Sequence, residues 1–176
     1  MKARRFNNVM PYVNELWAAQ VLGMQVNSHH GPDIIDDKKN CEVKFSFLDR
    51  KGKYPVSWTV LEYQMDYNNG KPCYWALGTY RLRLPVKKIK TENTEELERL
   101  VTQRELFVVT WDWMHQYPAH AVSGFTRKSG HWHNIFRYPK FKDLPKTTHA
   151  YEVDKGLVHL TEGVSEEDFN IEVVPF

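Results

Sequence analysis

Hydrophobic residues in the first half of the chain recur first at the spacing of a helix and later at that of strands. The helical pattern covers residues 11–22, where Pro11 suits the first helical position and Gly23 the end of the helix. A second helix is expected from Ser57, a good N-cap residue, to about Tyr67. The other apolar runs favour strands. The predicted order is helix, three strands, helix and strand, with the strands at residues 24–27, around 34–35, 43–47 and 74–84.

The second half of the chain predicts mainly strands. A capping box at residues 93–96 opens a helix that is expected to reach about Arg104, and residues 106–111 indicate a buried strand. Residues 113–142 mix aromatic and basic side chains and match no single period, whereas residues 151–160 predict a hairpin. The length of 176 residues suits one ordinary core, so a single domain over the whole chain is expected.

The second and third predicted strands are expected to form a hairpin with an even-numbered loop. If Asp36 lies opposite Cys41, then Asp33 lies opposite Lys44. Because side chains alternate along a strand, Asp33, Glu42 and Lys44 then project from one face, and the apolar residues of both strands point to the other. An odd-numbered loop would break this convergence, because it would move one strand's side chains to the opposite face.

This pair of carboxylates beside an ammonium group predicts a particular chemistry. Two neighbouring carboxylates repel each other unless a cation lies between them, and Mg²⁺ is usually held by one or two carboxylates together with waters and phosphate oxygens. A lysine beside such a metal orients or deprotonates water, or stabilises developing phosphate charge. These are the groups needed to hydrolyse a phosphodiester.

The motif Pro32-Asp33 followed by Glu42-Val43-Lys44 resembles the PD-(D/E)XK nuclease superfamily, which includes restriction enzymes, junction resolvases and DNA-repair nucleases. The resemblance implies that Asp33 and Glu42 bind Mg²⁺, which Mn²⁺ can replace, and that Lys44 serves the attacking water. The carbonyl of Val43 is a candidate further ligand.

The resemblance also implies a fold of the α/β class. It covers about residues 11–84 and implies a restriction-endonuclease-like αβββαβ core, with a mixed central sheet flanked by helices. The order of elements predicted from periodicity agrees with that core. A β-rich C-terminal extension is expected over about residues 106–176, about which the resemblance says nothing.

Three residues are candidates for accessory roles. On a helical wheel Glu15 is flanked by apolar residues, and family members often place an acidic residue of this helix near the metal; a glutamate that reaches solvent is the alternative. Some family branches carry a glutamine and a tyrosine one helical turn apart after the lysine, and Gln64 resembles that glutamine, although the spacing to Tyr67 is one residue shorter. His30 is a candidate contact for phosphate or a metal-bound water, or a surface histidine.

Charge adds a candidate DNA surface. The net charge of +2 does not by itself indicate nucleic-acid binding, but basic residues cluster at 50–53, 81–90 and 127–142. Within these clusters, Lys51, Lys53, Arg127 and Lys128 are expected to contact phosphates. The alternative for the aromatic residues of the last cluster is a structural role in a β-rich core.

The sequence therefore predicts a Mg²⁺-dependent DNA endonuclease of the restriction, homing or junction-resolving type, acting as a homodimer or higher even oligomer. The alternatives are a non-catalytic DNA-binding module that retains the nuclease fold, and a structure-specific exonuclease.

Two cysteines, Cys41 and Cys73, suit a reducing compartment, and no apolar run reaches the roughly 20 residues of a membrane span. The N-terminal residues also lack the apolar core of a signal peptide, so a cytoplasmic protein without membrane contact is expected.

Overall fold

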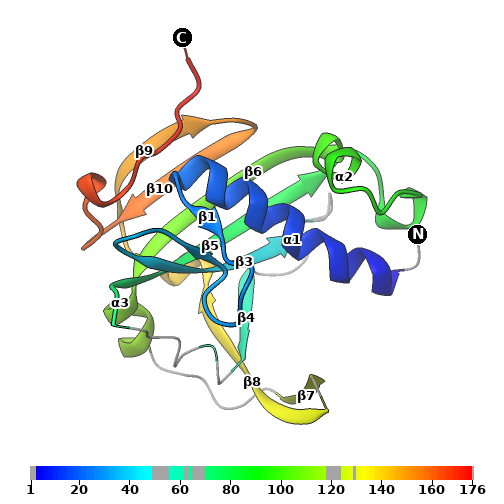
Figure 1. Cartoon of the computed structure of the whole chain (residues 1–176), viewed down its shortest axis with the longest axis horizontal. Helices are drawn as coiled ribbons and strands as arrows, with labels where there is room; N and C mark the ends of the chain where they lie inside the picture. Colours follow the sequence, from blue (N-terminus) through cyan, green and yellow to red (C-terminus); the bar gives the residue numbers. More distant parts are fainter. Residues whose placement is uncertain are drawn as a thin grey trace.

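The computed structural model describes residues 3–48, 56–61, 64, 70–117, 124–128 and 130–175 (Figure 1). The helices are α1 (Ala3–Leu22), α2 (Thr94–Leu100) and α3 (Trp111–Gln116). The strands are β1 (Gln25–Val26), β2 (Ile34–Ile35), β3 (Asn40–Phe47), β4 (Ser57–Leu61), β5 (Cys73–Leu82), β6 (Val101–Thr110), β7 (Gly124–Lys128), β8 (His131–Lys140), β9 (Thr147–Val153) and β10 (Gly156–Thr161).

In the described part of the chain, the strands form one large and one small sheet. The large sheet has seven strands in the order β1-β2-β3-β5-β6-β10-β9, and the small sheet has three in the order β4-β8-β7. Neighbours in the large sheet are antiparallel except for the pairs β3–β5 and β6–β10, which are parallel. The prediction of an α/β chain with a mixed sheet is therefore confirmed.

The two faces of the large sheet have different covers. Helix α1 runs across one face (Figure 1), where Trp17 and Leu22 are buried with Val43, Ala76 and Val108. Side chains alternate along β5 and β6, so Trp75, Leu77 and Val109 point to the other face. There they pack against Trp58 and Val60 of β4 and Met114 of α3. Strand β3 thus lies between a helix on one side and the small sheet on the other.

Helix α1 begins at Ala3, well before the predicted start at Pro11. A proline inside a helix costs roughly 3 kcal/mol, because it removes a hydrogen bond and crowds the preceding turn. The apolar stripe of α1 offsets this cost, since Phe6 and Met10 are 3% and 1% exposed in a cluster with Leu82. The end is as predicted, at Gly23 with φ of 65°. No helix in the described ranges has the length and apolar character needed to cross a bilayer.

The prediction of a helix from Ser57 is wrong, because Ser57–Leu61 forms strand β4 and pairs with β8. Trp58 and Val60 are buried while Thr59 between them is exposed, so the burial has the period of a strand. Tryptophan, valine and threonine also favour strands. Of the rest of the predicted helix, only Gln64 belongs to the described residues.

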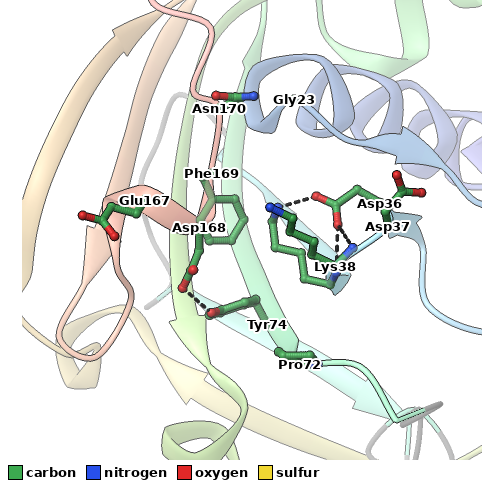
Figure 2. A pocket seen from close by; sticks show the side chains of 11 residues that line it. Gly23, Asp36, Asp37, Lys38, Pro72, Tyr74, Glu167, Asp168, Phe169 and Asn170 are labelled. Atoms are coloured by element: carbon green, nitrogen blue, oxygen red, sulfur yellow. Dashed lines mark hydrogen bonds and ion pairs between the residues drawn. The ribbon is translucent and has the colours of Figure 1, made fainter.

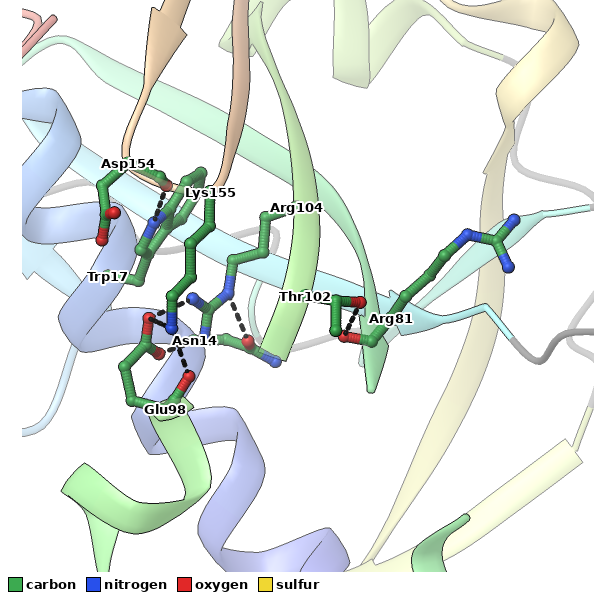
Figure 3. A network of polar contacts seen from close by, with 8 residues as sticks. All are labelled: Asn14, Trp17, Arg81, Glu98, Thr102, Arg104, Asp154 and Lys155. Atoms are coloured by element: carbon green, nitrogen blue, oxygen red, sulfur yellow. Dashed lines mark hydrogen bonds and ion pairs between the residues drawn. The ribbon is translucent and has the colours of Figure 1, made fainter. Parts of the chain in front are cut away.

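Helix α2 starts as predicted but ends at Leu100 instead of Arg104. Asn93 caps it by accepting a hydrogen bond from the backbone N–H of Glu96, 3.1 Å away. Strand β6 then begins at Val101, and its fully buried Arg104 donates to both carboxylate oxygens of Glu98, at 2.7 and 2.6 Å (Figure 3). Because this ion pair compensates the buried charge, an arginine can lie inside the strand, which its charge alone would not predict. The predicted closing hairpin is present as β9 and β10, with Lys155 at φ of 60° in the turn.

Gly78 on β5 holds β3 and β4 close together. Its carbonyl accepts a hydrogen bond from the indole Nε1 of Trp58 at 2.7 Å, and a methyl group at this position would overlap the ring of Phe45. Replacing Gly78 by alanine is therefore expected to lower the free energy of unfolding by about 1–3 kcal/mol, measured by urea denaturation. The double variant with Phe45→Leu should recover part of this loss, because leucine leaves room for the methyl group. If the effects of the two substitutions on the free energy of unfolding simply added up, the overlap between Gly78→Ala and the ring of Phe45 would be contradicted.

Candidate functional site

The predicted hairpin forms, but its strands pair two residues away from the expected register. Ile34 lies opposite Cys41. Continuing this register by one residue puts Asp33 opposite Glu42, where Lys44 was expected. The loop is still even-numbered, and it closes through the backbone N–H of Asp36 donating to the carbonyl of Lys39 at 3.0 Å. A shift of two residues preserves the faces of both strands. The apolar face packs in the core, where Ile34 and Cys41 are fully buried.

The structure brings Asp33, Glu42 and Lys44 together. The ammonium Nζ of Lys44 donates to Oε1 of Glu42 at 3.2 Å. The backbone N–H of Val43 donates to Oδ2 of Asp33 at 2.8 Å. Because the N–H and C=O of one residue point to the same side of a strand, the carbonyl of Val43 also faces the side of Asp33. The candidate ligands thus lie along one edge of β3.

Glu42 is the most perturbed group of the trio. It is 1% exposed, and its buried Oε2 atom accepts no hydrogen bond from a described N–H or O–H donor, while the carboxyl group of Asp33 lies within hydrogen-bonding reach of the Glu42 carboxyl. Burial raises the pKa of Glu42 well above its usual value, the neighbouring charge of Asp33 raises it further, and Lys44 only partly opposes this. A carboxylate in this position requires either a proton or a further cation.

The pKa of Lys44 is raised as well, but by its neighbours and not by burial. Burial alone would lower the pKa of its ammonium group, but the carboxylates of Glu42, Asp33 and Glu15 outweigh burial and raise that pKa. Its side chain is 20% exposed, and its ammonium group is bonded to the buried glutamate. Lys44 is therefore positively charged at neutral pH.

Two residues of the trio, Asp33 and Lys44, border a cavity of about 890 Å³ that runs along β3 between α1 and β4. Val43 also lines it, whereas the buried Glu42 is not part of the lining. Glu15 of α1 and Gln64 line the same cavity, as candidates for accessory roles should. His30 is exposed and lies outside this lining.

Part of the lining was not predicted from the sequence. Asn7 belongs to the turns of α1 that precede Pro11, the predicted helix start. Ser57 and Thr59 lie on β4, where a helix was expected. Phe47 and Tyr80 come from correctly predicted strands, but the sequence alone does not show that they meet at the cavity. These omissions follow from the two wrong element assignments and from unpredictable contacts between strands.

The donor set fits magnesium better than zinc. Among the described residues no group of three or more histidine, cysteine, aspartate or glutamate side chains is placed to hold a metal ion. Asp33 and Glu42 form a pair of carboxylates, with the Val43 carbonyl as a third oxygen on the same edge. Mg²⁺ needs no more than this from the protein when waters and phosphate oxygens complete its coordination, whereas a structural Zn²⁺ needs four nitrogen or sulfur ligands.

The predicted phosphate contacts remain predictions. Lys51 and Lys53 lie outside the described residues, and for Arg127 and Lys128 the structure describes only the backbone of β7. Figure 1 shows β7 and β8 extending away from the large sheet, below the end of β4.

A second cavity, of about 450 Å³, lies between the β2–β3 turn and residues 167–170 (Figure 2). Several of its groups contact one another: Lys39 forms an ion pair with Asp36 and lies 4.8 Å from the ring centroid of Phe169, and Tyr74 donates to Asp168 at 2.8 Å. These contacts hold the C-terminal segment against the hairpin and β5. None of the residues predicted as ligands or catalytic groups lines this second cavity.

No protein-family model matches the chain, and no match was found among curated proteins or solved structures. The resemblance to PD-(D/E)XK nucleases therefore rests on the motif and on the geometry described above.

Proposed function

We propose that this protein is a Mg²⁺-dependent nuclease that hydrolyses phosphodiester bonds in DNA. The observation that carries the proposal is the close pair of carboxyl groups of Glu42 and Asp33 beside the charged Lys44, in which the buried Oε2 of Glu42 accepts no hydrogen bond from a described N–H or O–H donor. Buried polar atoms in native proteins are nearly always satisfied, so this arrangement needs an explanation. A shared proton satisfies it when the pair is partly neutral, and a divalent cation would satisfy it when both carboxylates are ionised.

Each residue then has a distinct role. Asp33 and Glu42 would hold the metal, with the carbonyl of Val43 as a candidate further ligand and Glu15, which lines the same cavity, as a candidate outer ligand. A bound Mg²⁺ would supply Lewis acidity, which favours ionisation of water and withdraws charge from a phosphoryl oxygen. Lys44 would orient the attacking water or stabilise the charge that develops on the phosphate, because its ammonium group is fixed by Glu42 and the residue lines the cavity.

The topology supports the same proposal. Strands β1, β2 and β3 are antiparallel in sequence order, and β5 then lies parallel to β3. Helix α1 followed by β1, β2 and β3 agrees with the first part of the expected αβββαβ order, and the β2–β3 hairpin carries the two carboxylates. The crossover between β3 and β5 carries β4 in the described residues, where that core would carry a helix. The family assignment is therefore part of the proposal.

A cleavage survey tests the proposal. Supercoiled plasmid, single-stranded DNA and branched DNA are incubated with the protein and Mg²⁺, Mn²⁺, Ca²⁺ or a chelator. We expect cleavage with Mg²⁺ or Mn²⁺, little turnover with Ca²⁺ because its looser coordination positions water poorly, and none with the chelator. Full activity in excess chelator would remove the metal from the mechanism.

The same survey separates the alternatives. A circular plasmid has no ends, so a nick identifies an endonuclease, whereas loss of linear DNA alone indicates an exonuclease. Binding without cleavage of any substrate would favour a DNA-binding module.

A homodimer or higher even oligomer is part of the proposal, because two identical sites related by a two-fold axis match antiparallel strands. Light scattering in the presence of DNA measures this assembly.

A further inference from the structure

Phe47, the last residue of β3, is an aromatic side chain exposed at the metal-site cavity. It is 41% exposed and lines the same cavity as Asp33 and Lys44. Its ring lies 5.3 Å from that of Tyr80, which is 6% exposed and therefore fixed in the core. Phe47 thus rests on a buried ring and presents its remaining surface to solvent.

The position of Phe47 relative to the site is set by the strand. Lys44 and Phe47 are three residues apart on β3, so their side chains leave opposite faces of the strand, with Cα atoms about 10 Å apart, and both line the cavity that runs along it. The lining also carries hydroxyl groups, from Ser46 on β3 and from Ser57 and Thr59 on β4, beside the apolar Phe45 and Trp58. Hydroxyl groups suit the sugar and the edges of bases, whereas the charge at Lys44 suits a phosphate.

We infer that Phe47 stacks on an unpaired base of the DNA strand that is cut, close to the scissile phosphate. The inference rests on the proposed function and names its substrate class: DNA with an unpaired nucleotide at the cleavage point, as in a single strand, a flap or a branch. A phenylalanine offers no hydrogen bond, so its contact is stacking, which every base supports. In an intact duplex each base is already stacked on its neighbours, and the ring reaches a base only after it leaves the helix.

The chain provides a matched control for this residue. Phe141 is 44% exposed, and its ring also rests on one other aromatic side chain, Phe107, with centroids 5.4 Å apart. Phe141 does not line the metal-site cavity. A single exposed apolar side chain is common on protein surfaces, so Phe141 represents that ordinary case.

The test uses single-stranded oligonucleotides that carry 2-aminopurine at successive positions, titrated with protein in Ca²⁺ so that the DNA stays uncut. Stacking quenches the fluorescence of this base analogue. For the wild type we expect quenching at one or two adjacent positions. Phe47→Ala should lose that quenching and bind the single strand about tenfold more weakly. Phe47→Trp should retain both properties, and Phe141→Ala should behave as the wild type.

The outcomes separate this inference from the proposed function. Wild-type protein that does not bind the single strand, or Phe47→Ala protein that binds and quenches as the wild type does, would overturn the inference. So would an equal loss of affinity for a fully paired duplex. Because the titration involves no cleavage, a protein that stacks DNA on Phe47 yet never cuts any substrate would refute the nuclease proposal alone.

Discussion

Replacing Lys44 by methionine is expected to slow DNA cleavage by about two to four orders of magnitude while metal binding survives. The ammonium group lies 3.2 Å from Glu42 Oε1 and borders the cavity, so it can act on water or phosphate without being a metal ligand. Methionine keeps much of the packing of the side chain but removes its charge. The loss of a nearby positive charge should leave the affinity for a cation unchanged or higher.

The measurement pairs a plasmid-nicking assay with a calorimetric titration of Ca²⁺ on the same protein. Lys155→Met is the matched control, because Lys155 also pairs with a glutamate, Glu98 at 3.7 Å, but lies away from the cavity. The control should nick at the wild-type rate. If Lys44→Met does so too, the motif is a chance match on a hairpin. A parallel loss of metal affinity would instead give Lys44 a purely structural role.

Replacing Glu42 by glutamine is expected to abolish metal binding and to stabilise the metal-free protein at neutral pH by about 0.5–2 kcal/mol. The pKa of Glu42 is raised in the folded state, chiefly by burial. The folded protein therefore binds more protons than the unfolded chain between the ordinary and the raised pKa. The contribution of this group to stability is complete below its ordinary pKa and is lost as the pH rises through the raised one.

Thermal melts in chelator should show this pH dependence. The contribution of Glu42 should lower the melting temperature of the wild type as the pH rises through the raised pKa of this group, whereas Glu42→Gln should lack this component. Adding Ca²⁺ at pH 8 should raise the melting temperature of the wild type only, because the cation binds the folded state. Identical pH profiles for the two proteins would contradict the assignment of a strained carboxylate.

Replacing Glu98 by glutamine is expected to change the free energy of unfolding in the opposite direction from Glu42→Gln. Both of its carboxylate oxygens accept hydrogen bonds from the fully buried guanidinium of Arg104, which also donates to Asn14 (Figure 3). Glu98→Gln should therefore lower the free energy of unfolding by about 1.5–3 kcal/mol, because it weakens bonds to a buried charge. A stabilising effect at Glu42 together with a destabilising one at Glu98 distinguishes a functional carboxylate from a structural one.

Local signals were sufficient to predict the hairpin and the trio. The charged residues are separated by a short turn, and the alternation of side chains depends only on whether the loop is even or odd. A two-residue error in register therefore left Asp33, Glu42 and Lys44 on one face. The strands β5 and β10 were likewise predictable from their apolar runs.

The errors at Pro11 and Arg104 arose where tertiary contacts overrode local preference. Pro11 is a strong local signal for a helix start, but the burial of Phe6 and Met10 against Leu82 extends α1 through it. Arg104 reads as the end of a helix, and only its bonds to Glu98 and Asn14 allow a strand there. At Ser57 the error has a local cause. The capping preference of serine predicts a helix start, whereas the alternation of Trp58 and Val60 already favours a strand.

The most direct test of the central claim is single-turnover nicking of supercoiled plasmid in Mg²⁺ by the wild type and Glu42→Gln side by side. Glutamine has nearly the same shape as glutamate, and its carbonyl oxygen still accepts a hydrogen bond from Lys44, so the hairpin should keep its geometry. The predicted result is nicking by the wild type and a rate at least about a hundredfold lower for the variant. Equal rates for the two proteins, or a wild type that leaves every plasmid molecule intact in Mg²⁺, would contradict it.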